Sequence, residues 1–178
     1  MSLFGENKNL STMTAKKYIL NKEVAAQKMQ RMALEIAEQL SDDPTELIII
    51  GIKNSGMVIA EKMGLLVQQY LTSTIKIIGL TINKQEPNEV ILSKLNLDFN
   101  NKNIILVDDV ANSGKTLLYA LKPLLAFHAK RIQTLVLVER MHKLFPIKSD
   151  YIGLTLATTL QDHIQVEVKD GEVEGAFI

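Results

Sequence analysis

Ile104-Ile-Leu-Val-Asp-Asp-Val-Ala-Asn-Ser-Gly-Lys-Thr116 is the stretch that decides the fold. Its apolar first part predicts a strand over 103–110 that is buried on both faces, as in a parallel sheet. Two acidic residues, Asp108 and Asp109, end this strand. The small polar turn after them leads into a helix that Ser113 can cap. A strand, a polar turn and a helix in this order indicate one unit of an α/β protein.

The same alternation recurs along the chain. Ala25, Met29, Met32 and Ile36 follow the spacing of an amphipathic helix. The predicted strands are 47–52, 74–82, 90–95, 103–110, 131–140, 151–154 and 164–168. The predicted helices are 21–40, 57–70 and 113–125, the last kinked at Pro123. Strands that alternate with such helices predict a doubly wound, mostly parallel sheet flanked by helices.

Length and composition indicate a single domain. The chain has 178 residues, 47% of them apolar, and no cysteine, which excludes disulfides and thiolate metal sites. Residues 1–15 are polar and are expected to form a flexible arm before a single domain over 16–178. No run reaches the roughly 20 apolar residues of a membrane span, and the first residues lack a signal sequence. A cytoplasmic protein is therefore expected.

The charge balance argues against a protein that is basic throughout. Lysine plus arginine and aspartate plus glutamate are each 20, so the whole-domain positive charge of many nucleic-acid-binding proteins is absent. Lys16, Lys17, Lys22, Lys28 and Arg31 gather near the amino terminus. We interpret them as a solvated helix face, with a local RNA-binding face as the alternative.

The turn after 103–110 has the composition of a phosphate site. Gly114 allows close approach of the backbone, Ser113 and Thr116 supply hydroxyls, and Lys115 supplies charge. A triphosphate P-loop needs glycine five positions before Gly114, where this chain has Asp109. Carboxylates repel a triphosphate but accept hydrogen bonds from sugar hydroxyls. The pattern therefore predicts a ribose 5-phosphate site and disfavours a kinase or NTPase.

A second candidate loop is Gly51-Ile-Lys-Asn-Ser-Gly56, between a buried strand and a helix. Its glycines and Lys53 favour an anion at the start of that helix. In an open α/β sheet both loops lie beyond the carboxyl ends of the strands, where ligands bind.

These motifs resemble a known family. The stretch 108–116 resembles the phosphoribosyl pyrophosphate (PRPP) motif of type I phosphoribosyltransferases. Together with Gly51-Ile-Lys53, Leu137-Val-Glu-Arg140, His142-Lys-Leu-Phe-Pro-Ile-Lys148 and Asp150-Tyr-Ile-Gly153, it is similar to the pyrimidine operon attenuator family, which also has uracil phosphoribosyltransferase activity. The resemblance runs from about residue 17 to residue 168.

The resemblance implies a type I phosphoribosyltransferase fold with a small hood, and transfer from Mg²⁺-bound PRPP to a nucleobase, uracil or an oxopurine. A homodimer or higher homo-oligomer is also implied, as is a non-proline cis peptide within 51–55. By the same resemblance Asp108 and Asp109 are catalytic and no protein side chain is expected to ligate the metal directly. The implied PRPP contacts are Asp108, Asp109, Ala111, Asn112, Ser113, Gly114, Lys115 and Thr116. The implied pyrophosphate contacts are Lys53, Asn54, Ser55 and Lys84. The implied base contacts are Val138, Arg140, Lys148, Tyr151 and Ile152.

The chain departs from the attenuator pattern at three places. Asn54-Ser55 stands where the family has Thr-Arg, and 81–86 lacks the family's Arg-Asp-Asp group. Lys115 stands in place of an arginine, so the charge is kept but the forked hydrogen-bond donors of a guanidinium are lost. These changes bear on pyrophosphate handling. The alternative function is therefore a catalytically weak regulator that senses UMP or PRPP and binds RNA.

Some of these residues also have plainer interpretations. Tyr151 can cover a flat base or pack in the core. Arg140 and His142 can be surface residues, while His128 and His163 are expected to be structural or exposed, without a metal partner at ligand spacing.

Overall fold

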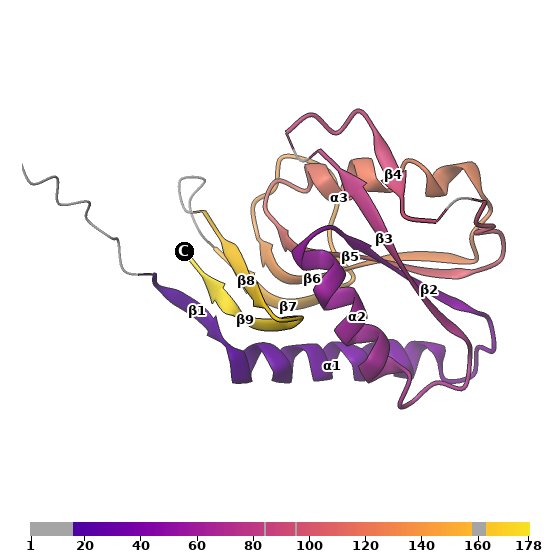
Figure 1. Ribbon diagram of the computed structural model, residues 1–178, viewed down its shortest axis with the longest axis horizontal. Coiled ribbons are helices and arrows are strands. Elements are labelled where there is room, and N and C mark those ends of the chain that lie inside the picture. The colour runs from indigo at the N-terminus through magenta and orange to yellow at the C-terminus, as the bar shows by residue number, and fades with distance from the viewer. Residues whose placement is uncertain (1–15, 84, 95, 158–162) are drawn as a thin grey trace, which may run out of the picture.

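The computed structural model describes residues 16–83, 85–94, 96–157 and 163–178. The predicted arm 1–15 and Lys84 lie outside the described residues. The main sheet has six strands in the order β4-β3-β2-β5-β6-β7, parallel except for β4 (Figure 1). Its strands are β2 (Leu47–Ile52), β3 (Ile75–Ile82), β4 (Val90–Leu92), β5 (Asn103–Ala111), β6 (Arg131–Arg140) and β7 (Tyr151–Leu156). This arrangement confirms the predicted doubly wound α/β fold.

A second, three-stranded antiparallel sheet forms the hood, in the order β1-β9-β8. Its strands are β1 (Tyr18–Asn21), β8 (Gln165–Lys169) and β9 (Glu172–Phe177). The sequence interpretation recognised only the β8 part of this sheet. β1 and β9 were both missed. β1 has four residues, and its partner among the described strands is β9, from the far end of the chain.

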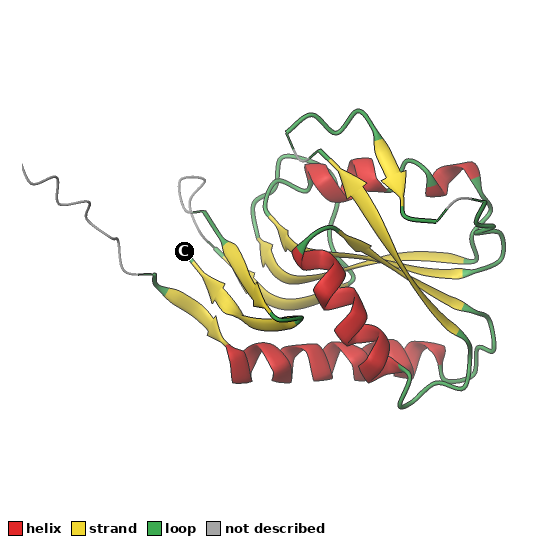
Figure 2. Ribbon diagram, viewed as in Figure 1, coloured by secondary structure: helices red, strands yellow, loops and turns green. Residues whose placement is uncertain are grey.

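Helices cover both faces of the main sheet (Figure 2). They are α1 (Lys22–Leu40), α2 (Ser55–Val67), α3 (Lys115–Ala120) and the 3₁₀ turn η1 (Leu124–Ala126). Alternate side chains of each strand point to opposite faces. Ile49, Ile105 and Leu135 therefore pack with α1, α2 and the hood, whereas Leu106 and Val136 pack on the α3 and η1 side.

The first helix forms as its pattern predicts. Asn21 is the N-cap, and its side chain accepts a hydrogen bond of 2.8 Å from the Val24 amide. The helix buries the face that starts at Ala25 and ends at Leu40. Among the described helices, none has both the length and the apolar character that a membrane span requires.

Two predicted helices end earlier than expected. α2 stops at Val67, so Tyr70 lies past the helix and is 45% exposed. α3 is six residues long and is followed by a turn and η1, which replace the predicted kinked helix to Leu125. Pro123 has no amide hydrogen, so an α-helix cannot continue through it with its hydrogen bonds intact.

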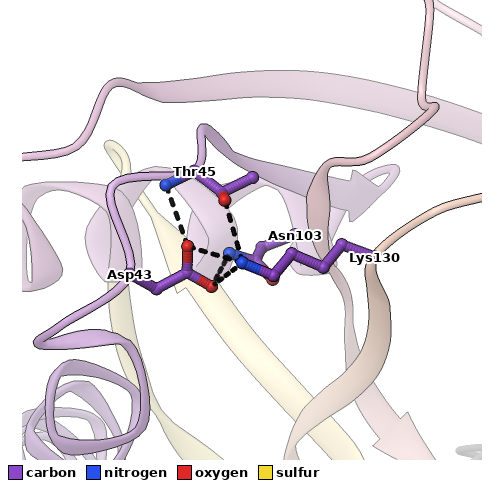
Figure 3. A network of polar contacts seen from close by, with 4 residues as sticks. All are labelled: Asp43, Thr45, Asn103 and Lys130. Atoms are coloured by element: carbon purple, nitrogen blue, oxygen red, sulfur yellow. Dashed lines mark hydrogen bonds and ion pairs between the residues drawn. The ribbon is translucent and has the colours of Figure 1, made fainter.

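Asp43 ties together the amino ends of three parallel strands (Figure 3). Its carboxylate accepts hydrogen bonds from the Thr45 amide before β2 at 2.9 Å and from Asn103 Nδ2 in β5 at 3.0 Å. Lys130, just before β6, places its ammonium 2.8 Å from Asp43 Oδ2. Lys130, Thr45 and Asn103 together hold the pKa of the Asp43 carboxyl well below its usual range.

Replacing Asp43 with asparagine is expected to lower the free energy of unfolding by about 1–2 kcal/mol at about pH 7. Because the folded-state pKa is depressed, this stabilisation is present above the unfolded pKa of about 4 and is lost as the pH falls through the folded value. Urea unfolding of both proteins at about pH 7 and about pH 3 measures the difference, which should shrink at low pH.

The exposed neighbour Asp42 provides the control, since Asp42→Asn should change stability by less than about 0.5 kcal/mol. If the free energies of unfolding of wild type and Asp43→Asn differed by the same amount at both pH values, the stabilisation would not depend on the ionisation of Asp43.

Candidate active site

Two acidic residues stand at the carboxyl end of β5. Asp108 is 1% exposed, and its Oδ1 accepts a hydrogen bond of 3.0 Å from the Asp109 amide. Asp109 is half-buried, and its own Oδ1 accepts from the Val110 amide at 2.9 Å. Each carboxylate is thus fixed by the backbone that follows it. The sheet places them at the edge where ligands of open α/β folds bind.

A tight turn over 111–114 follows the acids. Gly114 has a φ of 81°, in the left-handed region that favours glycine. The turn is held from both sides, because the Lys115 amide donates to Ser113 Oγ at 3.2 Å and the Phe145 amide donates to the Ser113 carbonyl at 3.0 Å. A rigid turn with hydroxyls and backbone amides is suited to a phosphate group.

The acids and the turn line a cavity of about 440 Å³, within the size range of small-molecule sites. One wall consists of 108–114 with Thr116 and Leu117. The hood segment 163–166 also lines the cavity. The site therefore lies between the main sheet and the hood, two parts that are far apart in the sequence.

The loop after β2 lies beside these acids, because β2 and β5 are neighbouring parallel strands. The Lys53–Asn54 peptide bond is cis, which confirms the expectation for this loop. Gly56 in the first turn of α2 packs directly on β5: a Cβ there would lie 2.8 Å from the Val107 carbonyl oxygen and 3.1 Å from Asp108 Cα. Only a residue without a side chain lets α2 start this close to the acids.

A family model described as phosphoribosyl transferase domain matches residues 17–170. The chain belongs to this family. Among curated proteins, this phosphoribosyltransferase is 31% identical over 169 residues to the "Bifunctional protein PyrR" of Haemophilus ducreyi, with 87% of the chain and 94% of the relative covered. It is 29% identical over 174 residues to that of Clostridium novyi, covering 92% of the chain and 97% of the relative.

Solved structures agree on the fold. The phosphoribosyltransferase superposes on the hypoxanthine phosphoribosyltransferase of Trypanosoma cruzi with a TM-score of 0.73 and 11% identity, covering 89% of this chain and 94% of that one. For a hypoxanthine-guanine phosphoribosyltransferase of Bacillus anthracis the TM-score is 0.67 and the identity 18%, with 85% and 87% covered. The solved structures show the fold, and with the family model over residues 17–170 the chain is a type I phosphoribosyltransferase, a pentosyltransferase.

Most of the expected PRPP contacts meet at the cavity of the phosphoribosyltransferase. The residues of that set that line it are Asp108, Asp109, Ala111, Asn112, Ser113, Gly114 and Thr116. Lys115 instead donates to the Gln85 carbonyl at 3.1 Å, so its ammonium faces the loop after β3. The predicted pyrophosphate residues Lys53 and Asn54 are exposed on the neighbouring loop, and the predicted Lys84 lies outside the described residues.

The expected base contacts are less well placed. Tyr151 is the first residue of β7, is 1% exposed, and has its hydroxyl 2.9 Å from Gln39 Oε1 and 3.0 Å from Gln133 Oε1. Burial raises its pKa to about 12. This corrects the expectation that Tyr151 stacks on a base, since a ring packed in the core has no free face.

The other four expected base contacts do not line the cavity either. Val138 is fully buried and Arg140 is 3% exposed, so the surface interpretation of Arg140 is wrong. Ile152 packs on the α3 side of the sheet, while Lys148 is exposed in the loop before β7.

Two features were missed at the level of sequence. Glu139 and Lys143 form an ion pair with side chains only 5% and 9% exposed, and Glu139 also accepts from the Ser149 amide at 2.9 Å. This pair fastens the loop after β6. The second is His163, which lines the cavity from the hood. The spacing of Ile164 and Val166 indicated a strand there, but only the tertiary fold shows what it faces.

Proposed function

We propose that this phosphoribosyltransferase transfers the phosphoribosyl group of Mg²⁺-bound PRPP to a nucleobase, uracil or an oxopurine. The products are a nucleoside 5'-monophosphate and pyrophosphate. One observation carries the proposal: a pair of acids, Asp108 and Asp109, lies next to a rigid glycine turn within a single cavity. A ribose 5-phosphate has hydroxyls for the acids and a phosphate for the turn.

Each part of the site has a task in this reaction. Asp108 and Asp109 accept hydrogen bonds from the ribose hydroxyls. Backbone amides and hydroxyls of 111–116 hold the 5-phosphate. A nitrogen of the base attacks the anomeric carbon as pyrophosphate leaves, and positive charge develops on the sugar. Fixed carboxylates near that charge stabilise the transition state. Catalysis therefore comes from positioning the reactants and from electrostatic stabilisation of the transition state.

Mg²⁺ enters this proposal as part of the substrate. It typically keeps several waters and is held by one or two carboxylates together with substrate phosphates. Asp108 and Asp109 are assigned to the ribose hydroxyls, so Mg²⁺ would arrive bound to the phosphates of PRPP and would neutralise the leaving pyrophosphate.

The test is a thermal-shift and turnover panel. PRPP with Mg²⁺ should raise the melting temperature, and UMP, GMP and IMP should rank by affinity because a ligand of the native state stabilises it by mass action. PRPP-dependent conversion of uracil, guanine or hypoxanthine should follow the same ranking. A pure protein that binds neither PRPP nor any of these nucleotides would refute the proposal.

The second candidate is a catalytically weak regulator that senses UMP or PRPP in the same cavity and binds RNA. Two observations favour it: the curated relatives are named bifunctional, and Asn54-Ser55 offers no cation beside Lys53. RNA binding through a basic face would weaken steeply with salt. RNA binding that appears only with UMP, together with negligible turnover, would favour this alternative. The homo-oligomer and the cytoplasmic location stay predictions.

A further inference from the structure

One histidine, His163, lines the same cavity as the two acids. The lining consists of 108–114, 116 and 117 on the main sheet and 163–166 on the hood. Within these lining segments the ionisable side chains are Asp108, Asp109 and His163. In the proposed reaction the two aspartates hold ribose hydroxyls, which leaves the imidazole without a role.

The hood holds His163 in place through its neighbours. Ile164 and Val166 are 3% and 9% exposed and pack into the core that the hood shares with α1 and α2. His163 and Gln165, which alternate with them, are exposed. The imidazole therefore borders both the cavity and bulk water. A group in that position can take a proton from a bound molecule and pass it to solvent.

The proposed reaction releases a proton that such a group could accept. When the ring nitrogen of a base attacks the anomeric carbon, a C–N bond forms, the C–O bond to pyrophosphate breaks, and pyrophosphate leaves with the electron pair. The attacking nitrogen must then lose its hydrogen as a proton. We infer that His163 is a catalytic residue that accepts this proton, an inference that rests on the proposed function. Imidazole suits the task because it is the side chain that ordinarily changes charge near neutral pH.

The charged groups around the hood do not compete for this role. β5, α2 and β9 pack against β8. The charged side chains on these three elements are Asp108, Asp109, Glu61, Lys62, Glu172 and Glu174. Lys62 pairs with Glu172 and Lys22 with Glu174 outside the cavity, so the two aspartates are the charges that share it with His163.

The test is the pH profile of His163→Gln, which keeps a hydrogen-bonding side chain but cannot titrate. Wild-type kcat is expected to fall as the solution is made more acidic, because a protonated imidazole cannot accept a proton. In the variant this acid limb should disappear and kcat at about pH 8 should drop about 50-fold, less than is usual for a general base because water can replace it at an exposed site. KM for PRPP and the PRPP-induced thermal shift should stay unchanged.

His128→Gln is the matched control, since His128 is exposed and lies away from the cavity lining. Its backbone amide donates to Asn100 Oδ1 at 2.8 Å and its carbonyl accepts from the Asn101 amide at 2.9 Å, and a glutamine backbone can make both hydrogen bonds. A His163→Gln protein that keeps both the wild-type kcat and the acid limb overturns the inference while the proposed function stands. A wild-type protein without turnover on any base, whether or not PRPP shifts its melting temperature, overturns the inference together with the proposed catalysis.

Discussion

Asp109→Asn is expected to lower kcat/KM for PRPP about 10³-fold, the upper range for removing one electrostatic contact to a transition state. The substitution tests the charge specifically, because asparagine keeps an oxygen that can accept the hydrogen bond from the Val110 amide. That hydrogen bond, 2.9 Å in length, fixes the side chain. It removes the negative charge beside the sugar. The melting temperature should therefore change little. Initial rates at varied PRPP, with the base chosen by the panel, measure the effect.

The chain offers a matched control for this loss of charge. Asp98 also accepts a hydrogen bond of 2.9 Å from a backbone amide, that of Asn100, and it is exposed on a turn away from the cavity lining. Asp98→Asn should leave kcat/KM unchanged. An Asp109→Asn enzyme within about threefold of wild type would show that this carboxylate does not face the developing charge, and the ribose assignment would fail with it.

The sequence was sufficient for the features that depend on local pattern. The apolar run at 103–110 and the acids after it predicted both the buried strand and its place at the ligand-binding edge, and the parallel pairing of β5 with β2 and β6 agrees. Asn21 as the N-cap of α1 followed from residue type alone. Such features are encoded within about ten neighbouring residues.

What the sequence did not predict depends on distant partners. Tyr151 is a residue type expected of a base contact, but Gln39 in α1 and Gln133 in β6 meet its hydroxyl. Its ring is buried in the core cluster that includes residues of α1. Likewise His163 gains its position only when the hood folds against the main sheet. Periodicity gives the face on which a side chain lies, whereas the identity of the opposing surface requires the tertiary fold.

The second large effect is expected at Gly114, where two independent penalties coincide. A side chain at a φ of 81° costs about 1–2 kcal/mol in the left-handed region. A Cβ would also lie 2.7 Å from Ile147 Cγ2 and 3.3 Å from the Phe145 carbonyl oxygen. Because Phe145 is itself hydrogen-bonded to Ser113, relief of this clash displaces the turn that holds the phosphate. Gly114→Ala should weaken PRPP binding at least about 100-fold, about 2.7 kcal/mol.

Gly171 is a control that separates the backbone penalty at positive φ from the penalty of the Cβ clash. Its φ of 77° matches that of Gly114, but a Cβ there meets nothing within 4 Å. Gly171→Ala should cost only about 1 kcal/mol of stability and leave PRPP affinity intact. Adding Ile147→Ala to Gly114→Ala removes the clashing methyl group and should restore part of the affinity, while the backbone penalty persists. Calorimetric titration with PRPP and urea unfolding distinguish these outcomes. Equal PRPP affinity in the two single glycine variants would mean that the turn at Gly114 does not hold the phosphate, and the assignment of the phosphate site would have to move elsewhere in the cavity.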